Sequence, residues 1–144
     1  MFEPHPQSEE RKRSAAALIK YLVAERKPEV LPSHLRELLS ILLWKITEAD
    51  SHKYKTRFQT QGAMDCSEKS KLRHEHVFQR SKMIAALEKA APQEIDAILE
   101  KAVGCTVTIE EHTRLSRFDE EYGWERYRKA EIVVFDTQTG ERLI

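Results

Sequence analysis

The stretch GCTVTIEEH, residues 104–112, decides the fold because the hydrophobic pattern of the chain changes within it. Before Gly104 apolar residues recur every three or four positions, whereas inside the stretch they alternate with threonine. Alternation of this kind predicts a half-buried strand. Thr108 and Glu111 then have the spacing of a capping box, which predicts a helix from the end of the strand to about Arg117.

Upstream of this strand, apolar residues at helical spacing and capping signals predict four main helices. Their expected ranges are 8–27, 33–50, about 67 or 72 to 90, and 92–102. A short connection containing Pro28 and Pro32 separates the first two helices, which we therefore expect to pack as an antiparallel pair. Residues 51–66 have no regular pattern.

Downstream of the strand, GWERY at 123–127 predicts one or two helical turns, and IVVF at 132–135 predicts another strand. DTQTG at 136–140 is a cluster of turn residues, after which 141–144 is expected to return as the second arm of a hairpin. The predicted fold class is therefore α+β, with four main helices and a small, mostly antiparallel sheet near the C-terminus.

Length and charge limit the possible functions. The 144 residues are enough for a single globular domain, expected at 8–144 after a flexible tail at 1–7. The 24 Lys and Arg balance the 24 Asp and Glu, which excludes a polybasic nucleic-acid coat. Residues 1–90 hold 17 basic and 12 acidic residues, while 91–144 hold 7 and 12, so the first part is better suited to meet an anion.

The cysteines and the N-terminus indicate a cytoplasmic protein with no membrane partner. Cys66 and Cys105 form no Cys-x-x-Cys motif and are expected to be free thiols in a reducing compartment. The N-terminus has no apolar core of a secretory signal, and the chain has no apolar run near the ~20 residues that span a bilayer.

The densest polar cluster is LRHEHVFQR, residues 72–80, in which two histidines flank Glu75. On an extended segment His74 and His76 would point to the same face and could share a metal ion. On a helix the same two side chains would be about 200° apart and could not do so. The sequence leaves both conformations open.

A second cluster, EEH at 110–112, follows the predicted strand. If the two clusters meet, a divalent metal such as Zn²⁺ or Mn²⁺ would have four candidate ligands: His74, His76, Glu111 and His112. Glu75 or His76 would then activate water, which gives a metal-assisted phosphodiester hydrolase. In the alternative interpretation the histidines are structural or solvated and Glu111 only caps a helix. The chain contains no His-Glu-x-x-His motif, Gly-rich phosphate loop or zinc-finger spacing.

Cations alternate with aromatic residues in HKYKTRF, residues 52–58. Cations can contact phosphate, and an exposed ring can stack on a base. Neutral overall charge, small size and the absence of catalytic motifs favour, over the hydrolase, a noncatalytic module that docks a protein or nucleic-acid partner through a basic face around residues 52–82. Its candidate binding residues are Lys53, Lys55, Arg57, Arg73 and Arg80. In the alternative, Tyr54 and Phe58 cover the core and the lysines are simply solvated.

Three stretches, LRHEHV at 72–77, VTIEEH at 107–112 and GWERY at 123–127, resemble a family of small uncharacterised bacterial and phage-associated proteins. The resemblance covers roughly residues 53–135 and implies no activity. A looser resemblance is to the H-N-H nucleases, in which an acidic residue and a histidine, here EHV at 75–77, open the metal motif on a hairpin. This chain contains no asparagine, so the middle residue of that motif is absent.

Overall fold

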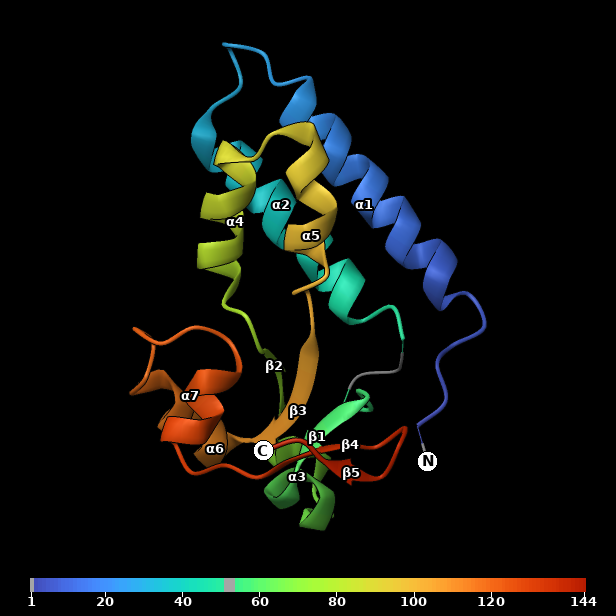
Figure 1. Ribbon diagram of the computed structural model, residues 1–144, viewed down its shortest axis with the longest axis vertical. Coiled ribbons are helices and arrows are strands. Elements are labelled where there is room, and N and C mark those ends of the chain that lie inside the picture. Colours follow the sequence, from blue (N-terminus) through green and yellow to red (C-terminus); the bar gives the residue numbers. More distant parts are fainter. Residues whose placement is uncertain (1, 51–53) are drawn as a thin grey trace.

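A computed structural model describes residues 2–50 and 54–144 of the chain. Over these residues it contains seven α-helices, two 3-10 turns and five strands (Figure 1). In chain order they are α1 (Ser8–Ala24), α2 (Pro32–Thr47), β1 (Phe58–Thr60), α3 (Gln61–Asp65), η1 (Lys69–Lys71), β2 (Leu72–His76), α4 (Arg80–Lys89), η2 (Pro92–Glu94), α5 (Ile95–Leu99), β3 (Gly104–Thr108), α6 (Ile109–Ser116), α7 (Trp124–Lys129), β4 (Val134–Asp136) and β5 (Glu141–Arg142).

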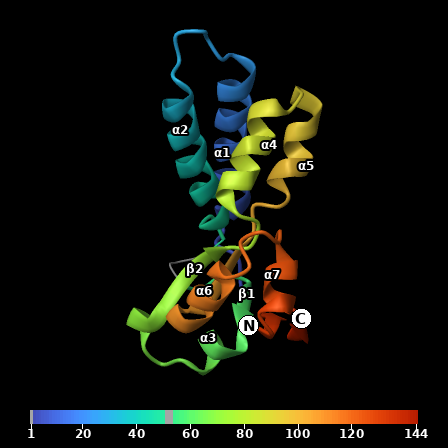
Figure 2. The ribbon, with the colours of Figure 1, turned by 90° about the vertical axis from the view of Figure 1, so that its left-hand side faces the viewer.

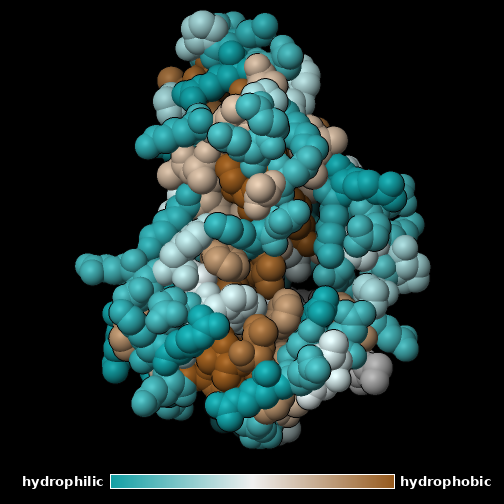
Figure 3. Space-filling model, viewed as in Figure 1, coloured by the Kyte–Doolittle hydropathy of each residue, from teal (hydrophilic) through white to brown (hydrophobic). Residues whose placement is uncertain are grey.

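The molecule has a helical lobe and a sheet lobe, which Figures 1 and 2 show one above the other. In the helical lobe, α1 and α2 form an antiparallel pair that α4 and α5 cover. The apolar stripes of these four helices form one core, whose centre is Ile19, Leu39, Leu43, Met83 and Leu87. Figure 3 shows polar residues over most of one face, with apolar residues visible between them in both lobes.

The sheet lobe is built on a five-stranded mixed sheet with the order β2-β3-β1-β4-β5. Only β1 and β3 pair in parallel, and the other three neighbouring pairs are antiparallel. One face of the sheet packs on α6 and α7 and forms a second core, which includes Val77, Cys105, Val107, Leu115, Tyr127 and Val134. Phe78 packs against both cores, because it lies where β2 leads into α4.

The α+β class is confirmed, and so is the strand-to-helix junction after Gly104. The side chain of Thr108 accepts the Glu111 backbone N–H at 3.1 Å, and Glu111 accepts the Thr108 N–H at 2.8 Å. The two reciprocal bonds satisfy N–H groups at the helix start that have no partner within the helix.

Other expectations differ from the structure. The predicted third helix is wrong over residues 72–76, because this segment pairs with β3 along its whole length as strand β2. The helix expected at 92–102 is shorter, consisting of η2 and α5. The sheet is not confined to the C-terminus, because β1 and β2 also belong to it, and the helices outnumber the four main ones expected. Within the described residues, no helix is both long and apolar enough to cross a bilayer.

The expected tail is extended and lies beside the sheet lobe. The Phe2 N–H donates to the Thr137 carbonyl at 3.0 Å, and the His5 N–H donates to the Asp50 carbonyl at 2.9 Å. Asp50 also accepts a hydrogen bond from the side chain of Ser8, the first residue of α1. The flexibility expected for residues 1–7 stays a prediction.

Candidate functional site

The cluster LRHEH is extended in β2, so its side chains alternate between the two faces of the sheet. His74 and His76 lie on one face, together with Leu72. Glu75 lies on the other face, which it shares with Cys105 because the two residues are paired across β2 and β3. The two histidines therefore point to one side, as the extended alternative predicted, but their neighbour Glu75 does not.

The two imidazoles are held at the end of α2. Both Nε2 atoms lie near the Thr47 hydroxyl oxygen, at 3.0 Å for His74 and 3.1 Å for His76. The Thr47 hydroxyl also lies 3.2 Å from the Trp44 carbonyl, so it is the centre of a small hydrogen-bonded cluster in which the donor at each imidazole contact depends on the tautomer of the ring. The Trp44 ring also packs on both, with centroids 4.8 and 4.5 Å away.

Both histidines are neutral at pH 7. Burial lowers the pKa of His74 to about 4, and the nearby Arg80 charge contributes to this. Burial lowers the pKa of His76 to about 3, with further contributions from His74 and Arg80. Arg80 lies over the Trp44 ring, 4.9 Å from its centroid, and donates to Ser40.

Glu75 is the centre of a separate polar cluster on the other face. Its carboxylate lies 2.5 Å from His112 Nδ1 and 3.3 Å from the buried Arg126 guanidinium. Arg126 also donates to the His76 and Val77 carbonyls at 2.9 and 3.0 Å. The Glu75–His112 contact joins the two sequence clusters, but neither residue lines the large groove or the two smaller cavities of the described chain.

The predicted metal site is therefore not assembled. His74 and His76 lie under α2, and His112 lies across the sheet beside Glu75. Glu111 is a buried cap, whose carboxylate accepts hydrogen bonds from the Thr60 hydroxyl and the Thr108 N–H. Within the described residues, no three His, Cys, Asp or Glu side chains come together in a way that could hold a metal ion. The sheet separates the candidate ligands because β2 presents its side chains alternately to two faces.

The predicted basic face is also dispersed. Lys53 lies outside the described residues. Arg57 is paired with Asp136 through two hydrogen bonds, of 2.9 and 2.5 Å. Arg73 donates to the carbonyls of residues 70 and 72 in its own segment, and Arg80 packs on α2. Of the four candidates that the structure describes, only Lys55 lines the large groove.

That groove lies on the face of the sheet opposite α6 and α7. The strand pairing places one row of side chains across this face: His74, Thr106, Gln59, Phe135 and Arg142. The end of α2 covers the row at His74, whereas Gln59 and Phe135 line an open groove of about 1020 Å³.

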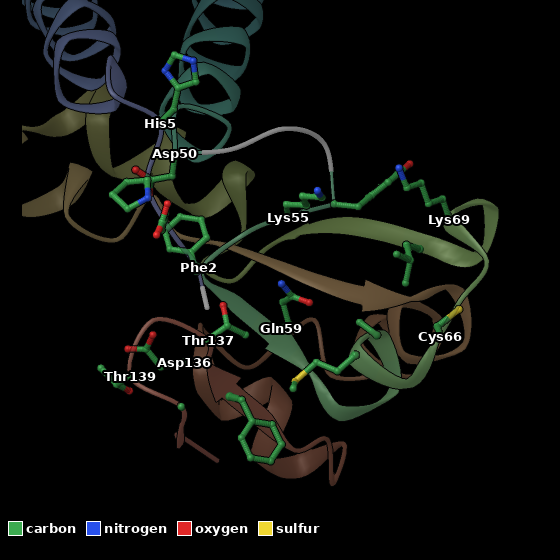
Figure 4. Close-up of a pocket in the computed structure, with 18 of the residues that line it drawn as sticks. Phe2, His5, Asp50, Lys55, Gln59, Cys66, Lys69, Asp136, Thr137 and Thr139 are labelled. Carbon is green, nitrogen blue, oxygen red and sulfur yellow. The ribbon is translucent and has the colours of Figure 1, made fainter.

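The walls of the groove come from three parts of the chain. They are the N-terminal segment, the α3–η1 region with Lys69, and the turn around Thr137. Figure 4 shows Lys55 and Lys69 at the rim, Gln59 below them, and Phe2 at the end nearest Asp50 and Thr137.

The sequence did not indicate Gln59, Phe135 or Arg142 as binding residues, whereas Lys69 lies within the basic face predicted around residues 52–82. The run of β-branched and aromatic residues in IVVF did indicate a strand, so Phe135 was recognisable as a strand residue. Its neighbours across the sheet depend on strand register, for which the sequence carries no local signal. Comparisons with protein-family models, curated proteins and solved structures found no match for this chain.

Proposed function

We propose that the protein is a noncatalytic cytoplasmic module that binds single-stranded nucleic acid in the open groove of the sheet. The observation that carries the proposal is the row formed by Gln59, Phe135 and Arg142, of which Gln59 and Phe135 line the groove together with Lys55 and Lys69. The two free thiols, Cys66 and Cys105, support a reducing compartment.

The row offers a ring between an amide and a cation. Phe135 is partly exposed, and the register places it directly opposite Gln59 on β1 and Arg142 on β5. Side chains opposite each other in antiparallel strands are about 5 Å apart at Cβ, close enough to act on one nucleotide. A partly exposed ring on a sheet surface is a platform on which an unpaired base can stack.

The charges around the groove suit a phosphate backbone. Within the described residues, neither Lys55, Lys69 nor Arg142 takes part in an ion pair. By contrast, the two aspartates that line the groove are already paired. Asp50 binds Lys12, and Asp136 binds Arg57. Among the charged residues that line the groove and have no ion pair within the described residues, Lys55 and Lys69 outweigh Glu3, so the available charge is net positive. Phosphate contacts by such cations give affinity that falls with salt.

Single strands are favoured over duplexes because stacking on Phe135 requires a base that is free of its partner strand. The test is fluorescence anisotropy with a labelled mixed-sequence oligonucleotide, as single-stranded DNA, as RNA and as a duplex, at two salt concentrations. We expect the single strands to bind more tightly than the duplex. Equal binding of the duplex, or no binding at all, would refute the proposal.

Variants locate the binding. Because base stacking is worth roughly 1–3 kcal/mol, Phe135→Ala should weaken binding about 5-fold to 150-fold. Lys55→Glu and Lys69→Glu should weaken binding more strongly at low salt than at high salt. The matched controls are Tyr21→Ala and Lys27→Glu, two exposed residues of the helical lobe, which should leave binding unchanged. A protein partner would be indicated if the groove variants fold normally and no oligonucleotide binds.

The metal-assisted hydrolase is not proposed, because it requires a common site for His74, His76, Glu111 and His112. The Glu75–His112 contact alone provides a carboxylate and an imidazole, but neither residue lines the large groove or the two smaller cavities of the described chain.

A further inference from the structure

The N-terminal segment Phe2–Pro6 lies along the groove that we propose for nucleic acid. All five of its residues line the groove, and none belongs to a helix or strand. Pro4 and Pro6 favour an extended backbone and lack an N–H group, so the segment can donate few backbone hydrogen bonds.

The segment is attached weakly. Within the described residues, its backbone hydrogen bonds with neighbouring elements are three: the Phe2 N–H donates to Thr137, the His5 N–H donates to Asp50, and the His5 carbonyl accepts from the Ser8 N–H at the start of α1. Within the described residues, no side chain of the segment forms an ion pair, and His5 Nδ1 accepts only from the nearby Gln7 N–H. Segments held by few contacts open at low free-energy cost.

The first two described residues carry the chemistry expected of the ligand. Phe2 brings a ring into the groove, and Glu3 brings a carboxylate that has no ion-pair partner in the part of the chain that the structure describes. A ring next to a negative charge resembles the base and phosphate of a nucleotide. Phe2 and Glu3 therefore occupy the place and present the charge that a bound strand would.

We propose that Phe2–Pro6 is a displaceable strap that competes with single-stranded nucleic acid for the groove. This inference rests on the proposed function. When only a fraction of the protein is in the binding-competent state, the apparent affinity is the intrinsic affinity multiplied by that fraction. A strap that is closed nine-tenths of the time would thus weaken binding about tenfold.

The first test measures binding of the labelled single-stranded oligonucleotide by a variant that lacks residues 2–6 and by two point variants. We expect the deletion to tighten binding about tenfold, with smaller gains for Phe2→Ala and Glu3→Gln. The gain from Glu3→Gln should shrink at high salt. Glu9→Gln, which removes an exposed charge from the first turn of α1, is the control and should leave binding unchanged. Unchanged or weaker binding by the deletion variant, with a melting temperature like that of the full chain, would overturn the strap.

The second test needs no ligand, and so it separates failure of the strap from failure of the proposed function. Amide hydrogen exchange of the free protein should show the His5 amide exchanging about a hundredfold or more faster than the Ile19 amide, which lies in the buried stripe of α1. Any smaller difference contradicts a displaceable strap. If exchange is fast but neither the full chain nor the deletion variant binds an oligonucleotide, the nucleic-acid function is wrong.

Discussion

Lowering the pH from 7.5 to 5 should destabilise the protein strongly through His74 and His76. Both have a pKa far below the ordinary value of 6.5, about 4 and about 3, because burial disfavours the charged imidazolium and the Arg80 charge adds to this effect. In the unfolded chain each would take up a proton as the pH falls through about 6.5. The folded chain does not take up these protons until the pH reaches about 4, so stability is lost between these values.

The expected loss follows from the difference in proton binding. At pH 5 a histidine with an unfolded-state pKa of 6.5 and a folded-state pKa well below 5 reduces the free energy of unfolding by ~2 kcal/mol. The two residues together give a loss of ~4 kcal/mol relative to pH 7.5, where the effect is close to zero. This is a large share of the ~5–15 kcal/mol that stabilises a typical domain.

Urea unfolding followed by circular dichroism at pH 7.5, 6 and 5 measures this loss. The double variant His74→Gln with His76→Gln keeps an amide beside Thr47 that can donate or accept a hydrogen bond but cannot titrate, so its stability should depend on pH by ~4 kcal/mol less than that of the wild type. His34→Gln, at an exposed position on α2, is the matched control and should retain the wild-type dependence. If the wild type and the double variant differ in pH dependence by less than ~1 kcal/mol, the reasoning about buried neutral imidazoles is refuted.

Three further changes have definite expected outcomes. Burial raises the pKa of Cys105, so Ellman's reagent should modify Cys66 alone in the native protein and both thiols after unfolding; two fast-reacting native thiols would contradict the buried position. Gly123→Ala should lower the free energy of unfolding by about 2 kcal/mol or more, because the backbone φ of Gly123 is +66° and the new Cβ would lie 2.2 Å from a Phe78 ring carbon. An unchanged midpoint of urea unfolding would contradict this expectation. Thr108→Ala removes the capping hydroxyl of α6 and should cost ~1 kcal/mol in the same measurement, whereas Thr113→Ala on the exposed side of that helix should cost less.

The sequence predicted elements whose signals are local. The capping box at Thr108 and Glu111 needs only residues three apart, and the apolar stripes of α1 and α2 need only helical spacing. In contrast, LRHEH has no apolar alternation and becomes a strand because its backbone pairs with β3. Strand pairing across a long sequence separation overrides such weak local preference.

The candidate site depended still more on tertiary structure. His74 does not meet His112 because β2 turns His74 to the face of the sheet opposite α6, which carries His112. A shift of one residue in the register of β2 would turn His74 to the face on which α6 packs. The sequence left open whether the two clusters meet, and the structure joins them through Glu75 and His112. The row through Gln59 and Phe135 required the order of the strands. Residue type identified candidates, and strand register decided which of them became neighbours.

The path of the chain between β2 and β3 has a consequence for folding. These strands are antiparallel neighbours, yet α4 and α5 lie between them in the sequence and join a core with α1 and α2. The strand ends remain together, since the Val77 N–H donates to the Val103 carbonyl at 3.0 Å. The helices α4 and α5 are thus a long insertion in what would otherwise be a simple β-hairpin. Separation of β2 from β3 would release both ends of this insertion and so loosen the helical core. We therefore expect the two cores, although largely distinct in their residues, to melt in a single cooperative transition.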